Sequence, residues 1–151
     1  MRPAPRTFLI APGAANCLTS LDPRSYPVPR FVILQHDHPT LHWDLMLETG
    51  GVLRTWRLAG PPSPGSAVAA EPLGDHRILY LDYEGPVSGN RGTVRRWDAG
   101  TYSGLTQQAE VTEFELVGGI VLGHCEISRH DGGRWQCVLA PPGTAKPPRT
   151  I

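Results

Sequence analysis

The feature that most constrains the fold is a stretch over residues 35–48, where three histidines and three carboxylates are interleaved with large apolar side chains. From Leu41 onward apolar and polar residues nearly alternate, so in a β-strand the leucines and the tryptophan would share one face. His42 and Asp44 would then both point to the other face, roughly 6.5 Å apart along the strand. The alternation therefore predicts a strand with one apolar side and one side that carries ionisable groups.

A second strand is expected just before this one, over residues 30–35, and residues 37–40 contain the Asp and Pro typical of a turn. The resulting hairpin would fold His36 back beside His42, with His38 as a bystander in the turn. Two imidazoles and the Asp44 carboxylate converging on one point would suit a divalent Mn, Zn or Fe ion, with positions left for water and substrate. Because an H-x-D triplet in a strand also arises by chance, the residues alone leave both interpretations open.

The rest of the chain has the pattern of short strands separated by turns. Of 151 residues, 17 are glycine and 16 are proline, and no window has a long apolar period of 3.6 residues. Hairpins in succession predict an all-β fold, a single compact antiparallel β-barrel of about eight short strands with long loops, with a β-sandwich as the alternative. The expected strands span residues 30–35, 42–49, 52–58, 76–85, 93–97 with a turn at 98–100, 101–103, 110–117, 120–129 and 134–139.

The composition divides the chain into three parts. Residues 1–29 are rich in Pro, Ala, Arg and Ser, which predicts an extended or disordered leader. Residues 30–139 form the expected barrel domain, and its longest loop is predicted over residues 59–74. Residues 140–151 are again Pro-rich, and we expect them to form a loose C-terminal tail.

Charge and cysteine content narrow the class of protein. A net charge of zero argues against non-specific coating of nucleic acid, although a local basic groove is compatible with it. The three cysteines have no metal-knuckle spacing, and the register between Cys125 and Cys137 on a predicted hairpin does not decide whether they form a bridge. Without a membrane-length apolar run or a signal core, a cytoplasmic protein with reduced thiols is expected.

Three separated motifs together carry a resemblance to a known family. In chain order they are His36-x5-His42-Trp43-Asp44-Leu45-x-Leu47-Glu48-x-Gly50-Gly51-Val52-Leu53-x-Thr55-Trp56, then Asp75-His76-x3-Tyr80-x-Asp82-Tyr83-Glu84-Gly85, and then Gly92-Thr93-Val94-x2-Trp97-Asp98-x-Gly100-Thr101-Tyr102. In this order and spacing they resemble the 3′-phosphoesterase domain of bacterial DNA ligase D, over about residues 30–139. Several ordered matches are more specific than any single motif.

The resemblance implies a compact β-barrel that binds a divalent cation, typically Mn²⁺, with Zn²⁺ or another transition metal as alternatives. Members of that family remove a 3′-terminal ribonucleoside to leave a 3′-phosphate, which a phosphomonoesterase step converts to a 3′-hydroxyl. The family's metal ligands fall on His36, His42 and Asp44, its histidine at the scissile phosphate falls on His76, and a phosphate-side tyrosine falls on Tyr80.

The same resemblance sets the expected partners. They are the 3′ ends of DNA or RNA primer-templates, with repair proteins such as a ligase or Ku acting in trans. We expect a free-standing monomer that does not bind membranes.

The sequence departs from the family pattern on the phosphate side of the site. The family has an arginine two residues after the metal aspartate, where this chain has Met46, and it has a lysine after a Trp-x-x-Pro segment that is missing after Trp56. Loss of the arginine removes a charge-assisted contact worth roughly 2–3 kcal/mol, so a weakened activity is expected. Arg54, Arg57 and Arg91 are the candidate phosphate-binding replacements.

Two other functions fit the same residues. The domain is compatible with a non-catalytic module that keeps the metal and binds nucleic-acid ends or a partner protein. A cupin-like metalloenzyme acting on a small molecule is the other alternative, because His and carboxylate ligands on a β-barrel also suit such chemistry. Without the resemblance, His76 would be interpreted as a surface residue and Tyr80 as packing.

Overall fold

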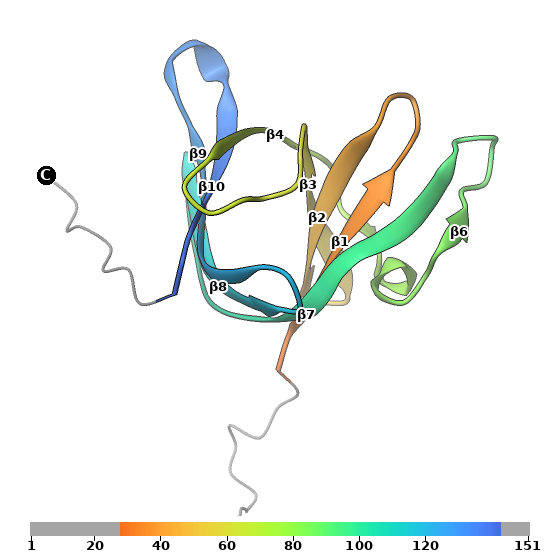
Figure 1. Cartoon of the computed structure of the whole chain (residues 1–151), viewed down its shortest axis with the longest axis horizontal. Helices are drawn as coiled ribbons and strands as arrows, with labels where there is room; N and C mark the ends of the chain where they lie inside the picture. Colours follow the sequence, from red (N-terminus) through yellow and green to blue (C-terminus); the bar gives the residue numbers. More distant parts are fainter. Residues whose placement is uncertain (1–27, 143–151) are drawn as a thin grey trace, which may run out of the picture.

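The computed structural model describes residues 28–142, and β-strands make up every regular element there except two short 3₁₀ turns (Figure 1). The strands are β1 (Arg30–His36), β2 (His42–Thr49), β3 (Val52–Leu58), β4 (Ala67–Pro72), β5 (His76–Arg77), β6 (Gly85–Pro86), β7 (Thr93–Gln108), β8 (Val111–Gly118), β9 (Leu122–Arg129) and β10 (Trp135–Ala140). The 3₁₀ turns are η1 (Ile78–Leu81) and η2 (Asp131–Gly133). The predicted leader up to residue 27 and the tail from residue 143 lie outside the described residues.

Eight of these strands form a closed ring. Hydrogen-bonded neighbours follow the order β1-β2-β3-β4-β10-β9-β8-β7, and β7 pairs in turn with β1, with every pair antiparallel. The short strands β5 and β6 lie off the ring and pair with β3 and β7. The predicted all-β antiparallel fold is thus confirmed, and closure leaves the sheet without a long free edge. Among the described residues, no helix has the length and apolar character needed to cross a membrane.

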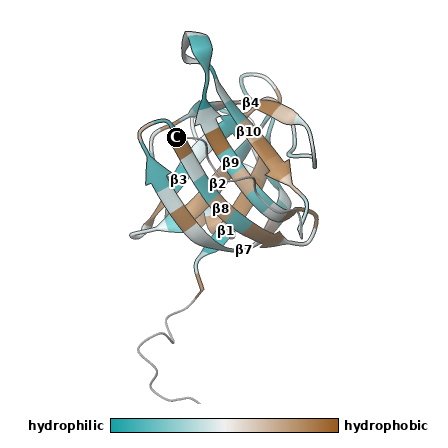
Figure 2. Ribbon diagram, turned by 90° about the vertical axis from the view of Figure 1, so that its left-hand side faces the viewer, coloured by the Kyte–Doolittle hydropathy of each residue, from teal (hydrophilic) through white to brown (hydrophobic). Residues whose placement is uncertain are grey.

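The ring has an apolar cluster on each side of β1 and β2. Figure 2 shows hydrophobic and hydrophilic segments alternating along the strands. The interior cluster includes Phe31, Leu45 and Trp56, while Leu34 and Met46 belong to a second cluster on the outer face. Both faces of these two strands are therefore buried, and the outer face is a covered surface rather than a solvated one.

A segment over residues 73–92 covers that outer face. It contains β5, η1 and β6, and Figure 1 shows η1 and β6 outside the ring beside β1 and β7. Leu81 is buried in the outer cluster, and Tyr80 and Tyr83 pack against it. An ion pair between Arg30 and Asp82, 2.6 Å between Nη2 and Oδ1, attaches the segment to the start of β1.

This ion pair depends on pH in one direction. The Arg30 guanidinium holds the pKa of the Asp82 carboxyl below its ordinary value, mainly through their hydrogen bond. The attachment is therefore complete at neutral pH and is lost as the pH falls through the lowered pKa. Because both side chains are exposed, its contribution to stability is small.

The structure corrects the predicted strand over residues 76–85. The chain is a strand only at His76–Arg77 and again at Gly85, where β6 begins, and between them it turns through η1, where the backbone N–H of Asp82 donates to the carbonyl of Leu79. The apolar residues of this stretch stand next to one another instead of alternating, and a 3₁₀ turn directs Leu81 and Tyr80 together onto the ring. The prediction of one continuous strand was therefore wrong.

Two further predictions need correction. The loop expected over residues 59–74 contains β4, a small-residue strand that pairs with β3 on one side and β10 on the other and so closes the ring. The turn expected at residues 98–100 is the middle of β7, which runs unbroken from Thr93 to Gln108. Its pairing with β1 shifts by one residue between Ile33 and Leu34, so Asp98 lies at a bulge and not at a chain reversal.

The interior also contains the two cysteines that the structure describes. Cys125 on β9 and Cys137 on β10 are free and buried, with 3.4 Å between their Sγ atoms. The neighbouring Cys137 thiol and complete burial raise the pKa of the Cys125 thiol well above its ordinary value. Cys125 is therefore a thiol and not a thiolate at neutral pH, and it packs as an apolar residue.

Candidate metal centre

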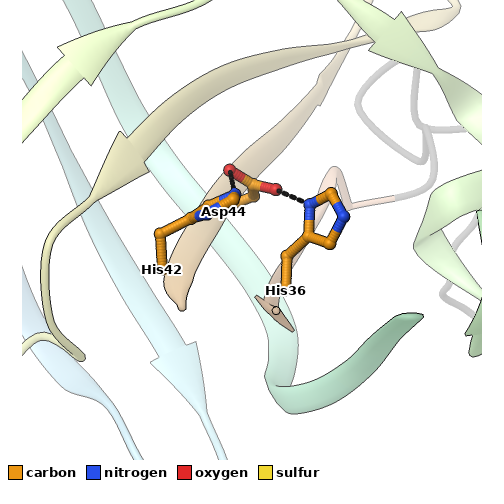
Figure 3. Close-up of side chains that lie close together, drawn as sticks. All are labelled: His36, His42 and Asp44. Atoms are coloured by element: carbon orange, nitrogen blue, oxygen red, sulfur yellow. Dashed lines mark ion pairs between the residues drawn. The ribbon is translucent and has the colours of Figure 1, made fainter. Parts of the chain in front are cut away.

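Three of the ionisable side chains from the first hairpin meet on the outer face of the ring. His36, the last residue of β1, pairs directly with His42, the first residue of β2, and Asp44 follows two residues later. One ligand atom from each of the three lies within 4.8 Å of the others. Figure 3 shows the Asp44 carboxylate between the two imidazole rings, 3.5 Å from His36 Nδ1 and 3.3 Å from His42 Nε2.

Backbone carbonyls fix which nitrogen of each ring faces the carboxylate. His42 Nδ1 lies 2.8 Å from the carbonyl oxygen of Thr40, and His36 Nε2 lies 2.8 Å from that of Arg91. Because a carbonyl only accepts, these two nitrogens carry the protons. In the neutral rings the opposite nitrogens then present lone pairs toward Asp44.

Lone pairs that face a carboxylate repel one another unless a cation lies between them. His42 is 3% exposed, and its Nε2 and the Oδ1 of Asp44 are buried without a hydrogen-bond partner among the described residues. Such unpaired buried atoms are costly in a folded protein. Two imidazole nitrogens and one carboxylate oxygen, oriented by outer carbonyls, are the donor set of a divalent transition metal, so these residues fit a metal ion.

The second half of the predicted site lies across a cavity of about 290 Å³. His36 and Asp44 line it from the ring, and His76 and Tyr80 line it from the covering segment. The remaining lining residues are Leu34, His38, Pro39, Met46, Arg57, Leu73, Val87, Arg91 and Val94. His42 instead lines an adjoining hollow of about 360 Å³. Residues that are far apart in the sequence are thus brought around one space.

The covering segment also orients His76. Its Nδ1 lies 3.0 Å from the carbonyl oxygen of Gly74, so this nitrogen carries a proton and Nε2 is left for the cavity. The His76 and Tyr80 rings meet edge to face with centroids 6.2 Å apart, and Tyr83 supports Tyr80 in the same way at 5.8 Å. Ile78, which a strand would have placed beside them, is instead exposed.

The three candidate arginines lie in different places. Arg57 and Arg91 line the cavity, but the Arg91 guanidinium is bonded to the carbonyl and hydroxyl oxygens of Ser88 at 2.7 and 3.2 Å. Arg54 does not line it: its guanidinium lies over the Trp56 ring, 5.1 Å from the centroid, and is hydrogen-bonded to Gln107. The alternation along β3 already separates Arg54 from Arg57.

One cavity residue was missed by the sequence reasoning. The sequence places His38 in the turn, as a bystander or as a group that supports a ligand, and the structure shows that it lines the cavity itself, with its ring centroid 6.5 Å from that of His36. A turn gives no periodic pattern from which the direction of a side chain can be deduced. The available signal was the density of histidines in residues 35–48.

Comparison with known proteins identifies the family to which the chain belongs. The sequence matches the DNA Ligase D 3′-phosphoesterase domain over residues 34–137, a span that begins in β1 and ends in β10. The chain belongs to this family. The resemblance seen in the sequence is confirmed, and the matched span contains both halves of the cavity.

Curated proteins of the same family extend far beyond this chain. The chain is 30% identical over 118 residues to the multifunctional non-homologous end joining protein LigD of Pseudomonas aeruginosa, which covers 72% of this chain and 13% of the relative. It is 30% identical over 114 residues to the multifunctional non-homologous end joining DNA repair protein LigD of Mycobacterium tuberculosis strain H37Rv, covering 70% of this chain and 15% of the relative. The chain thus spans about one seventh of the length of these 3′-phosphoesterase-domain relatives.

Proposed function

We propose that this chain is a divalent-metal-dependent phosphoesterase that processes the 3′ ends of nucleic acid in repair, removing a 3′-terminal ribonucleoside, a 3′-phosphate or both. The observation that carries the proposal is the convergence of His36, His42 and Asp44 on one point beside a cavity that His76 and Tyr80 also line. Membership of the 3′-phosphoesterase family supports nucleic-acid end processing, and the names of the relatives connect it with end-joining repair.

The proposed ion is Mn²⁺, because a mixed imidazole and carboxylate set with open positions suits it, and the family resemblance favours it over Zn²⁺. When bound, the ion would supply Lewis-acid polarisation of a phosphoryl oxygen. Asp44 provides the negative charge of the ligand set, and the carbonyls of Thr40 and Arg91 accept from the other ring nitrogens and so orient the ligating nitrogens of the neutral rings toward the ion site.

The residues of the covering segment have the proton-handling roles in this proposal. His76 holds its Nδ1 proton on the Gly74 carbonyl, so a second proton on Nε2 is directed to the cavity, where it stabilises phosphate charge or passes to the leaving oxygen. The Tyr80 hydroxyl donates to a non-bridging phosphate oxygen. The covering segment also keeps water from the apolar wall around Leu34 and Met46, which strengthens these polar contacts.

An end-trimming assay tests the proposal. Purified protein is incubated with Mn²⁺ and duplexes whose primer strand ends in one ribonucleotide or in a 3′-phosphate, and products are separated on a denaturing gel. We expect shortening of the first primer and phosphate release from the second, and loss of both with EDTA. A primer with a plain 3′-hydroxyl DNA end is the control. Absence of trimming with Mn²⁺, Zn²⁺ and other transition metals would overturn the proposal, and binding without trimming would favour a non-catalytic module.

Replacing Gly92 with alanine is expected to disturb the metal ligands without touching them. Gly92 has a φ of +77°, and an added Cβ would lie 2.6 Å from the Cβ of His38. The turn must then move away from the β1–β2 turn, which weakens the bond between His36 and the Arg91 carbonyl. We expect a loss of about 1–3 kcal/mol in unfolding free energy. Mn²⁺ affinity, measured by isothermal titration calorimetry, should fall about 10-fold or more.

Gly104 provides a matched control for this variant. Its φ of +66° imposes similar backbone strain on alanine, but nothing lies within 4 Å of an added Cβ. Gly104→Ala should therefore lose stability without losing Mn²⁺ affinity. Equal metal affinities for the Gly92 and Gly104 variants would contradict the role assigned to the Arg91 carbonyl.

A further inference from the structure

Arg57 is a direct cross-strand neighbour of Asp44, one of the metal-ligand candidates. On β3 its Cα pairs with that of Asp44 on β2, and alternation directs both side chains to the outer face of the ring. Arg57 lines both the 290 Å³ cavity and the 360 Å³ hollow next to it. Arg57 therefore borders the space that the proposed function assigns to the substrate phosphate.

The interactions of Arg57 leave most of its donors available. Its Nη1 lies 3.8 Å from Oε1 of Glu71, a loose ion pair in which the two side chains are 38% and 64% exposed. Its Nε is buried and has no hydrogen-bond partner in the part of the chain that the structure describes, a costly state for a charged group. A guanidinium offers five donors in a planar fork that matches phosphate, and the Nη groups of Arg57, whose one contact among the described residues is the loose pair with Glu71, can donate to a phosphate oxygen.

The other arginine of this cavity is not available in this way. Arg91 donates through Nε and Nη2 to two oxygens of Ser88, so the edge of its guanidinium that would bind a phosphate through two parallel bonds is already occupied within its own turn. The wall formed by Leu34, Met46 and Val94 offers no donor at all. Of the two arginines that line the cavity, Arg91 makes two side-chain hydrogen bonds, whereas Arg57 makes only the loose contact with Glu71 among the described residues.

We propose that Arg57 is the phosphate-binding cation of this site and that Glu71 is a counterion from which the phosphate displaces it. The inference rests on the proposed function, since it names the residue that holds the phosphate of the 3′ end. It gives Glu71 an opposing role, because a carboxylate beside the guanidinium competes with the phosphate for the same donors. Removing Arg57 and removing Glu71 should therefore shift phosphate binding in opposite directions.

The test compares binding before it compares turnover. A fluorescently labelled oligonucleotide duplex with a 3′-phosphate is titrated with wild-type protein, Arg57→Gln, Arg57→Lys and Glu71→Gln, at several salt concentrations with EDTA present to prevent turnover. Arg57→Gln should weaken binding about 10- to 100-fold and lower the salt-dependence slope by about one. Arg57→Lys should recover part of the affinity, because the charge remains and the fork does not. Glu71→Gln should tighten binding about 2- to 5-fold.

A similar ion pair elsewhere on the ring serves as the control. Arg129 and Glu110 lie 3.6 Å apart with side chains 48% and 61% exposed, away from the cavity. Arg129→Gln and Glu110→Gln change net charge exactly as the test variants do, so they report the general effect of charge. We expect both to bind the 3′-phosphate duplex within about 2-fold of wild type.

The outcomes distinguish a failure of this inference from a failure of the proposed phosphoesterase function. If wild type trims 3′ ends and Arg57→Gln binds and trims as well as Arg129→Gln, the inference is overturned and the phosphoesterase stands. If wild type neither binds nor trims the duplexes, the proposed function fails first. Melting temperatures of all variants show whether each is folded. If Arg57→Gln is unfolded, the change in duplex affinity of Glu71→Gln decides the inference: tighter binding supports it, and unchanged or weaker binding overturns it. With saturating Mn²⁺, Arg57→Gln should raise KM more than it lowers kcat.

Discussion

Replacing His42 with alanine should abolish metal-dependent trimming of 3′ ends, with a loss of more than about 100-fold in kcat/KM. Loss of a partner that only orients a metal ligand costs about 10- to 100-fold, and His42 is itself a proposed ligand, so its removal should cost more. The His42 Nε2 lone pair faces Asp44 and has no other partner within residues 28–142. The measurement is initial-rate kinetics on a ribonucleotide-ended primer across a range of Mn²⁺ concentrations.

A stability measurement shows whether the His42 variant fails through the metal or through unfolding. Mn²⁺ should raise the melting temperature of wild type, because a ligand that binds only the native state stabilises it, whereas His42→Ala should show no such shift. His130, which lies at the turn between β9 and β10 and bonds to Ser128, provides the control. His130→Ala should keep both the shift and the activity. Full activity in a folded His42→Ala protein would remove the metal centre from the mechanism.

Replacing Asp98 with alanine is expected to have the largest effect on stability, about 3–5 kcal/mol in unfolding free energy. The carboxylate is 6% exposed and accepts four backbone N–H bonds of 2.7–3.0 Å, from Ala99, Gly119, Ile120 and Val121. Alanine would leave these donors without an acceptor, and each hydrogen bond to a charged group contributes roughly 1.5–3 kcal/mol, partly recovered by water at the exposed turn. Urea denaturation followed by tryptophan fluorescence measures the loss.

The asparagine variant tests the reason given for the Asp98 effect. Asp98→Asn keeps the shape but turns a donor NH₂ group toward backbone donors, so it should lose roughly half as much stability as alanine. Asp131, an exposed residue of η2, is the control, and Asp131→Ala should change stability by less than about 0.5 kcal/mol. An Asp98→Ala protein as stable as the Asp131 variant would show that these four hydrogen bonds contribute nothing net.

The parts of the fold that sequence predicted well are those with strong local signals. Alternation from Leu41 and the Pro-containing turn before it specify the first hairpin, including the pairing of His36 with His42. β4 could not be predicted in this way, because its alanines have little strand preference and it exists as the strand between β3 and β10 that closes the ring. The structural role of Asp98 could not be predicted from its neighbours in the sequence either, because its carboxylate accepts from backbone N–H groups of a distant loop at residues 118–121.

The candidate site likewise has one part that the sequence could predict from local spacing and one part that it could not. Residues close in the sequence, such as His42 and Asp44, could be grouped by spacing alone. His76 and Tyr80 could be grouped with them only through the family resemblance, because the covering segment reaches the ring through long-range contacts that no local pattern encodes. Three arginines remained equivalent in the sequence, and only their surroundings in three dimensions distinguish Arg57 from Arg54 and Arg91.

Because the cavity lies between a closed ring and an added segment, holding the metal ion and contacting the strand end are assigned to different parts of the chain. Strands whose faces are both buried hold the proposed ligands, so substitutions that retune those ligands must also preserve the core. The segment over residues 73–92 carries His76 and Tyr80 and is joined to the ring by the two-residue strands β5 and β6 and the surface ion pair of Arg30 with Asp82. Exchange of that segment should therefore change which strand ends are accepted, and the ion site should be kept as long as the exchanged segment still presents the backbone carbonyl of Arg91 to His36.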